Sequence, residues 1–173
     1  MDRCAECGYD YDEISRDDIP DALLALAPRF HASLEGHKPG RLRARPRPDV
    51  WSPLEYACHV RDVLQVQEGR IKLALVEDEP AFAPMGREER VVKDKYNEQD
   101  PTQVAEQLSE AASALAQMLG SLDEEAWQRT GVYNWPTRQV RTVDWVGRHT
   151  LHEGRHHLWD IERLLQAPPP KQT

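Results

Sequence analysis

The feature that most constrains this chain is a proline-free stretch of 25 residues, from Thr142 to Gln166, which contains four of the seven histidines. Thr142 is a suitable helix N-cap, and the negative charge of Asp144 would interact favourably with the positive, N-terminal end of the helix. Pro168 begins a run of prolines that must end any helix. The stretch therefore predicts one long helix, and the placement of its histidines should indicate what that helix does.

Three of these histidines, His149, His152 and His156, share one side of the predicted helix, within an arc of roughly 60°. Two tryptophans fall on the same side and bracket them, whereas most aliphatic residues lie on the opposite side. His157 lies among those aliphatic residues. The helix is thus expected to have an ordinary core side and a separate imidazole stripe.

The pair His152 and His156 has the spacing i and i+4, at which two imidazole nitrogens can reach one cation. The letters HEGRH also satisfy the HExxH pattern of zinc helices, with Glu153 after the first histidine. A bare pair at this spacing also arises by chance on solvated faces. The density of histidines and the flanking tryptophans favour metal binding here.

A second metal-binding pattern lies at the start of the chain, where Cys4 and Cys7 form a CxxCG sequence. Such a knuckle presents two thiolates to zinc, and its glycine permits a tight turn. No second cysteine pair follows, because Cys58 is isolated in a predicted helix. Three interpretations stay open: half of a zinc site completed by histidines or acids elsewhere, a redox pair, or an unliganded turn. We favour the first.

Composition excludes several classes of function. The net charge of −8 and the pI of about 5.4 make a nucleic-acid partner unsuitable. No apolar run of about 18 residues predicts a membrane span, and the acidic N-terminus lacks the apolar region of a signal peptide. An odd number of cysteines fits a reducing compartment. We therefore expect a cytoplasmic protein that binds neither nucleic acid nor a membrane, which leaves a small-molecule substrate among the candidates.

Helix signals divide the chain into four main helices, which predicts an all-α fold. Expected ranges are about 18–37, interrupted by Pro28, then 52–76, 100–120 and 142–166, with a short helix over 122–127. Segments 37–50 and 77–100 contain several helix breakers, and 131–139 is expected to be an irregular link. We assign residues 1–17 to an N-terminal segment, 18–167 to the bundle and 168–173 to a tail.

The second long helix has a clear start and one inward histidine. Ser52, Pro53 and Glu55 have the spacing of a capping box with proline at the first helical position. His59 then falls on an apolar stripe that also contains Tyr56. A lone inward histidine is usually a hydrogen-bonded core residue, but the last helix offers two imidazoles that need a third ligand.

Two motifs resemble those of a known family. The sequence WSPLEYACH, residues 51–59, is similar to the second-helix signature of the DinB/YfiT-like superfamily, and HTLHEGRHH, residues 149–157, resembles its last-helix motif. Both occur in the order and at the separation that the family shows. The resemblance implies an up-and-down-type four-helix bundle, usually a homodimer, with a three-histidine site for a divalent metal.

Carried over residue by residue, the resemblance implies that His59, His152 and His156 bind the metal, for which zinc or nickel are the favoured ions. His149 and His157 would then support the ligands or pack beside them. The segment with Cys4 and Cys7 is not part of the family pattern.

The family resemblance also implies an activity. Related proteins include thiol-dependent transferases and isomerases that use mycothiol, bacillithiol or glutathione. The mycothiol-dependent maleylpyruvate isomerase type carries a glutamate where this chain has His152, which favours the all-histidine, YfiT-like branch. We therefore expect a metal-dependent transferase that activates a low-molecular-weight thiol, or water, for attack on an electrophile.

Two alternatives remain. One is a metal-dependent hydrolase with Glu153 as the base, by analogy with HExxH enzymes. The other is a non-catalytic protein, in which metal stabilises a dimer or a binding module and the CxxCG segment serves as a contact or sensor, since a fold does not fix a function.

Overall fold

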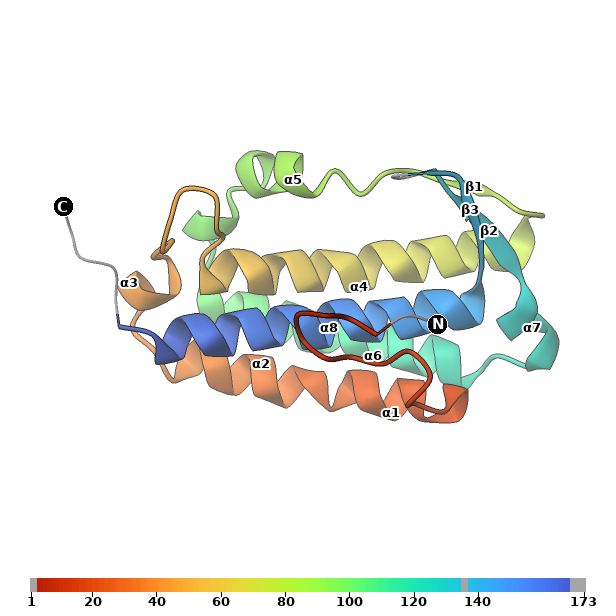
Figure 1. The fold of residues 1–173 in the computed structure, drawn as a ribbon, viewed down its shortest axis with the longest axis horizontal. Helices are drawn as coiled ribbons and strands as arrows, with labels where there is room; N and C mark the ends of the chain where they lie inside the picture. The colour runs from red at the N-terminus through yellow and green to blue at the C-terminus, as the bar shows by residue number, and fades with distance from the viewer. Residues whose placement is uncertain (1–2, 135–136, 169–173) are drawn as a thin grey trace.

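A computed structural model describes residues 3–134 and 137–168 of the chain. Four long helical units form a bundle: the pair α1 (Ile19–Leu24) and α2 (Leu26–Glu35), then α4 (Pro53–Val76), α6 (Pro101–Gly120) and α8 (Val143–Gln166) (Figure 1). The predicted four-helix bundle is confirmed. Helix α4 packs mainly against α6 and α8. Helices α1 and α2 pack against the same two helices, on the side that faces away from α4 (Figure 1).

The long helices begin where their capping residues predict. Ser52 and Glu55 form a complete capping box at the start of α4. The carboxylate of Asp100 accepts backbone hydrogen bonds at the start of α6, and the Thr142 hydroxyl accepts one from Trp145 at the start of α8. Local sequence therefore determines where these three helices begin.

The first helical unit is split at Ala25, three residues before the proline that was expected to break it. Pro28 lies in the first turn of α2, where a missing backbone N–H group needs no intrahelical partner. Its ring would clash with the carbonyl of Leu24, which is the last residue of α1. The break at Ala25 therefore directly follows the carbonyl group with which the ring would clash.

The basic segment 37–50 contains a single short helix, α3 (Pro39–Leu42), and its arginines bind parts of the protein. Arg41 donates to backbone carbonyl groups at the end of α8, and Arg43 donates to carbonyl groups that precede α6. Arg45 forms hydrogen bonds of 2.8 and 2.6 Å with both carboxylate oxygens of Glu55. These arginines therefore stabilise the fold by binding carbonyl and carboxylate groups of the protein itself.

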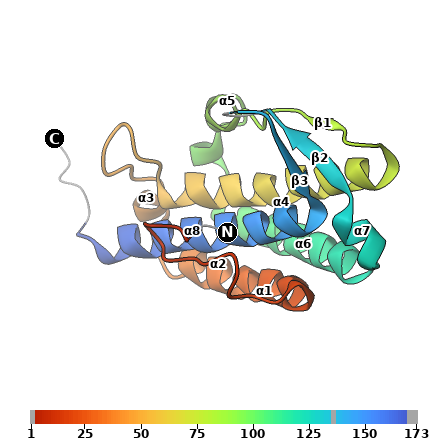
Figure 2. The ribbon, with the colours of Figure 1, turned by 45° about the vertical axis from the view of Figure 1, so that its right-hand side comes forward.

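A small sheet lies at one end of the bundle, next to the short helix α7 (Glu124–Gln128) (Figure 2). Its strands, in the order β1-β2-β3, are β1 (Ala81–Phe82), β2 (Thr130–Tyr133) and β3 (Gln139–Thr142). β2 pairs in parallel with β1 and antiparallel with β3. The expectation of an irregular link over 131–139 was therefore wrong, because strands of two to four residues are too short to show alternation. Trp135 and Pro136 of that link lie outside the described residues.

The connection from β1 to α6 contains two further short helices, α5 (Arg87–Lys93) and η2 (Tyr96–Glu98). Together with the sheet, it lies over the outer side of α4 (Figure 1). Helix α5 and η2 contact α4. Segment 77–100 is therefore an ordered cover over one side of the bundle.

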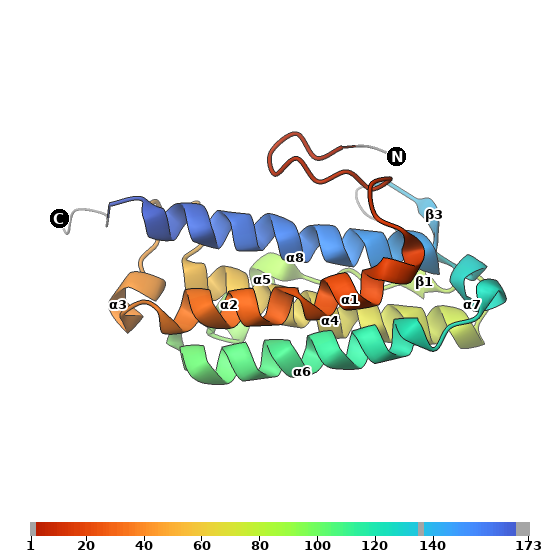
Figure 3. The same ribbon diagram turned by 90° about the horizontal axis from the view of Figure 1, so that it is seen from below.

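Helix α8 approaches the first helical unit closely at one glycine. A Cβ atom placed on Gly154 would lie 2.5 Å from Cδ1 of Leu26, which is too close for any real side chain. On the other side of α8, the N-terminal segment, residues 3–14, crosses the helix (Figure 3). Among the described residues, no helix is long and apolar enough to span a lipid bilayer.

Candidate metal centre

Three side chains between α4 and α8 form a group of metal-ligand type. The ligand atoms of His59, Glu153 and His157 all lie within 4.8 Å of one another. Nε2 of His59 and Nε2 of His157 are each 3.7 Å from Oε2 of Glu153. Glu153 and His157 are one helical turn apart on α8, so both reach towards α4. We call this group the bundle site.

Outer contacts orient the ligands of the bundle site. Nδ1 of His157 hydrogen-bonds Oδ2 of Asp160 at 3.0 Å, which leaves Nε2 free to face Glu153. The ring of Tyr56 stacks on His157, and Trp51 meets His59 edge to face, with centroid separations of 5.1 Å in both pairs. A carboxylate behind a histidine is the usual outer partner in metal sites, since it fixes the ring and raises its basicity.

In the bundle site, His157 and the neighbouring carboxylates share a proton. Burial alone would lower the pKa of His157, but hydrogen bonds with Asp160 and Glu153 outweigh it and raise that pKa to about 9. Burial also opposes ionisation of Glu153, yet hydrogen bonds with His157 and His59 hold its pKa well below the usual value. Burial lowers the pKa of His59. A cation could replace the proton of His157, because the carboxylates that stabilise one would stabilise the other.

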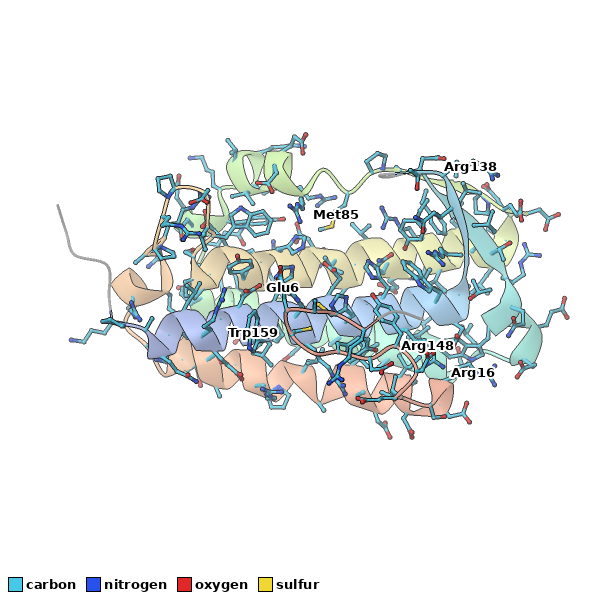
Figure 4. All side chains as sticks on the ribbon, in the orientation of Figure 1. Glu6, Arg16, Met85, Arg138, Arg148 and Trp159 are labelled. Atoms are coloured by element: carbon cyan, nitrogen blue, oxygen red, sulfur yellow. The ribbon has the colours of Figure 1, made fainter. Side chains whose placement is uncertain are left out.

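A second group lies on the neighbouring side of α8, under the N-terminal segment. It consists of Cys4, Cys7, His152 and His156, whose ligand atoms also lie within 4.8 Å of one another. Sγ of Cys4 is 3.6 Å from Nδ1 of His156. We call this group the N-terminal site. Figure 4 shows Glu6, from the same turn as the cysteines, above the middle of α8.

A tyrosine and a histidine connect the two groups. The hydroxyl of Tyr11 hydrogen-bonds Nδ1 of His149 at 2.9 Å and Nδ1 of His152 at 3.0 Å. Nε2 of His149 in turn lies 4.0 Å from Oε1 of Glu153. The N-terminal segment therefore contributes to the surroundings of both groups.

Three guanidinium groups also help to lower the pKa values of histidines in the candidate site. Arg87 contributes to lowering the pKa of His59, after burial, and Arg70 and Arg141 contribute in the same way at His149. Arg141 and Arg70 also lie over aromatic rings, at 4.6 Å from the centroid of Trp145 and 4.9 Å from that of Tyr133. The side of the site next to segment 77–100 and the sheet is therefore cationic, and it suits an anionic substrate.

The structure distributes the predicted ligands over two sites. His59 belongs to the bundle site, whereas His152 and His156 belong to the N-terminal site with Cys4 and Cys7. Within residues 3–134 and 137–168, no group within 4.8 Å contains His59 together with His152 and His156.

Sequence reasoning did not group Glu153 and His157 with His59, and it did not single out their partner Asp160. The spacing i and i+4 is as expected, but the pair that faces α4 begins one residue later. A signal for it was present in the sequence, since His157 falls on the aliphatic side of the helix. A histidine that points into the core needs polar partners, which here are the carboxylates of Asp160 and Glu153.

Comparison with known proteins identifies the family of the chain. The family model of the DinB superfamily matches residues 22–161. The chain belongs to the DinB superfamily. All three residues of the bundle site lie within the match, whereas Cys4 and Cys7 precede it.

Two solved structures have a similar fold. YfiT from Bacillus subtilis, described as a probable metal-dependent hydrolase with an unusual four-helix bundle topology, superposes with a TM-score of 0.77 at 20% identity. The alignment covers 88% of this chain and 90% of YfiT. The mycothiol-dependent maleylpyruvate isomerase superposes with a TM-score of 0.66 at 12% identity, over 93% of this chain and 65% of the isomerase. These identities support the shared fold alone.

No curated protein sequence matches the chain significantly. Any specific activity must therefore be argued from the site.

Proposed function

We propose that His59, Glu153 and His157 bind a divalent metal ion, and that this DinB superfamily member is a metal-dependent enzyme. The observation that carries the proposal is the convergence of three ligand atoms, with both imidazole Nε2 atoms 3.7 Å from one carboxylate oxygen. Ligand atoms on a tetrahedral zinc ion are separated by roughly 3.3 Å, given Zn–N and Zn–O bonds of about 2.0–2.1 Å. A small contraction would thus suffice to coordinate a cation.

The donor set suits a catalytic metal. Two histidines and one glutamate are the ligands of several zinc hydrolases, in which a fourth position stays open for water or substrate. A divalent ion in such a site holds a thiol as thiolate or lowers the pKa of water to about 7. Asp160 keeps the proton of His157 on Nδ1, so that Nε2 is available for coordination.

We propose a small thiol as the nucleophile and a carboxylate-bearing molecule as the electrophile. Arg70, Arg87 and Arg141 would attract the carboxylate, since each disfavours positive charge on a histidine of this region. Aromatic rings of Trp51 and Tyr56 border the ligands and would limit access of water. The fold shared with a mycothiol-dependent isomerase supports a thiol such as mycothiol or bacillithiol.

Metal-dependent hydrolysis is the second candidate function. It is favoured by the ligand set itself, because two histidines and a glutamate are typical of hydrolytic zinc sites. YfiT, which has the more similar fold, is also described as a probable hydrolase. In this arrangement Glu153 would bind the metal, and the base of the HExxH analogy would have to be another residue.

A direct test begins with chelated protein that is reloaded with zinc, nickel or manganese. Each form is assayed for loss of free thiol, with mycothiol, bacillithiol or glutathione and a panel of carboxylate-bearing electrophiles. Release of product from esters and amides is measured in parallel without thiol. We expect saturable thiol consumption only with metal, and its loss in His157→Ala and Glu153→Gln.

The outcomes separate the candidates. Thiol-independent turnover that needs the metal would replace the transferase by a hydrolase. Equal rates with and without metal would refute both. A matched control is His31→Ala, which removes an exposed histidine paired with Glu35 and should keep full activity.

A further inference from the structure

We propose that Cys4, Cys7, His152 and His156 bind a zinc ion in a closed, four-ligand structural site. The two cysteines of this site precede the region that matches the DinB superfamily, and its two histidines lie within that region. The inference does not rest on the proposed enzymatic function, because it concerns different ligands and a different side of α8.

The donor atoms have the chemistry and spacing of such a site. Two thiolates and two imidazoles form one of the standard structural zinc sets. Bonds of about 2.3 Å to sulfur and 2.0–2.1 Å to nitrogen, at tetrahedral angles, separate the two ligand atoms by about 3.6 Å. Sγ of Cys4 and Nδ1 of His156 are 3.6 Å apart. This pair therefore already has the separation that a shared zinc ion requires.

An unpaired nitrogen also points to a missing ligand. Nε2 of His152 is buried and has no hydrogen-bond partner among the described residues. The other ring nitrogen, Nδ1, is held by the hydroxyl of Tyr11 at 3.0 Å. A buried polar atom without a partner is costly, and a metal ion would remove that cost. An imidazole fixed through one nitrogen and open at the other is the usual form of a zinc ligand.

The backbone around the cysteines is built as a knuckle. The amide of Cys4 donates to the carbonyl of Tyr9 at 2.8 Å, and the amide of Gly8 donates to the carbonyl of Cys4 at 2.9 Å. Gly8 has a φ of +75°, which other residues rarely adopt. These contacts turn the chain tightly, so that both thiols face the same side. Neither cysteine is in a disulfide.

A metal here would fasten the N-terminal segment to the bundle. Residues 3–14 contain no helix, and their attachments to α8 include hydrogen bonds from Arg148 to the carbonyls of Tyr11 and Ile14, at 2.7 and 2.6 Å (Figure 4). Coordination would add two bonds from the segment and two from α8. The ion would thereby hold Tyr11 against His149, next to the bundle site.

The test uses the full chain, purified anaerobically with zinc, and measures metal content and cobalt spectra. Variants are Cys4→Ser/Cys7→Ser and His157→Ala, with Cys58→Ala as the control for loss of an unrelated thiol. We expect cobalt-loaded wild type and His157→Ala to show thiolate-to-cobalt charge-transfer absorption. The double serine variant should lack this absorption and contain one metal ion fewer than wild type.

Several results would overturn the proposal. One is the absence of charge-transfer absorption in wild type, a measurement that does not depend on whether a variant folds. Others are an unchanged metal content in the double serine variant and a disulfide between Cys4 and Cys7 in freshly purified protein. Loss of a metal only from His157→Ala would support the bundle site and refute this one, so the two proposals can fail separately.

Discussion

Two pairs of side chains lie next to each other on α8 and differ in what they meet. Glu153 and His157 face α4 and meet one histidine, so the proposed site there would have three ligands and an open position. His152 and His156 face the N-terminal segment and meet two cysteines, so the proposed site there would have four ligands and no open position. Open sites suit catalysis and closed sites suit structure. A rotation of about 100° along one helix thus separates two kinds of chemistry.

The two pairs also differ in their relation to the family. All ligands of the bundle site lie within residues 22–161, which match the DinB superfamily, whereas half of the N-terminal site precedes them. The N-terminal segment thus lies outside the family match and contacts the surroundings of the bundle site through Tyr11 and His149.

Removal of metal should have the largest effect and should distinguish the two regions. At free zinc about 1,000 times the dissociation constant, each occupied site stabilises the fold by about 4 kcal/mol. Chelation should therefore lower the melting temperature by roughly 8–16 °C per site in a chain of this length. Trypsin should then cleave first after Arg3 and Arg16, because the N-terminal segment loses its anchor. Cleavage within α4 or α8 first would contradict this order.

Exchange of a single proposed ligand should weaken zinc binding at one site and leave the other site intact. Glu153→Gln should weaken metal binding at the bundle site by more than about 100-fold, since loss of an outer partner alone costs about 10–100-fold. His152→Ala should do the same at the N-terminal site. Calorimetric titration of each variant with zinc should show one remaining site. A variant that lost both ions, while its circular dichroism stayed native, would show that the sites share ligands.

Exchange of Asp160 should affect the two sites to different degrees, because its carboxylate lies closer to His157 than to His156. Its Oδ2 is 3.0 Å from Nδ1 of His157 and 3.6 Å from Nε2 of His156. Asp160→Asn should lower metal affinity about 10–100-fold at the bundle site and less at the N-terminal site. Glu162→Gln, which loses only an exposed pair with Arg29, is the control. Equal losses at both sites would mean that Asp160 serves the two histidines alike.

Tyr11→Phe should have a smaller effect, which falls on the hydrogen bonds that connect the N-terminal site with the surroundings of the bundle site. It removes the hydroxyl that bonds both His149 and His152, at a cost of about 1 kcal/mol or roughly 2–4 °C in melting temperature. Both metals should remain. The control is Tyr9→Phe, which removes a hydrogen bond to the carbonyl of Arg148. Magnetic resonance of the imidazole protons should change for both histidines in Tyr11→Phe, and an unchanged His149 would disprove the link.

The pH dependence of metal-free protein should show the smallest effect. The pKa of His157 in the fold is about 9, above its value in the unfolded chain, so its stabilisation is complete below about pH 6.5 and is lost as the pH rises through 9. The difference in melting temperature between wild type and His157→Gln should shrink over this window. Zinc-loaded protein should show the opposite trend, because protons compete with the metal. Parallel trends in both forms would contradict this assignment.

Most of the fold could be predicted from the sequence because its signals are local. The capping residues Ser52, Asp100 and Thr142 determine helix starts through contacts within one turn. The three short strands could not be predicted, since strands of two to four residues show no alternation and β1 pairs with β2 from a distant segment. Gly131 illustrates this, as the ring of Phe82 occupies the space where a side chain would be.

The site was only partly predictable because the rotation of α8 about its axis depends on packing. Periodicity correctly grouped His152 with His156 and put His157 on the opposite side, but it could not say which side meets α4. That choice follows from the burial of Leu158 and Ile161 and from the contact of Gly154 with Leu26. The cysteines were recognised as half of a site, and their partners became visible only when the N-terminal segment was placed over α8.

The glycine in the middle of α8 has a consequence for how the chain can vary. In the two proposed sites, neighbouring positions on this helix would bind different ions, so a turn of the helix by one residue would offer each ion the wrong atoms. Gly154 lets α8 seat against Leu26 at a single angle. Gly154, the smallest residue of the HEGRH sequence, thus fixes the rotation of α8 about its axis and keeps the two adjacent sets of side chains from exchanging places.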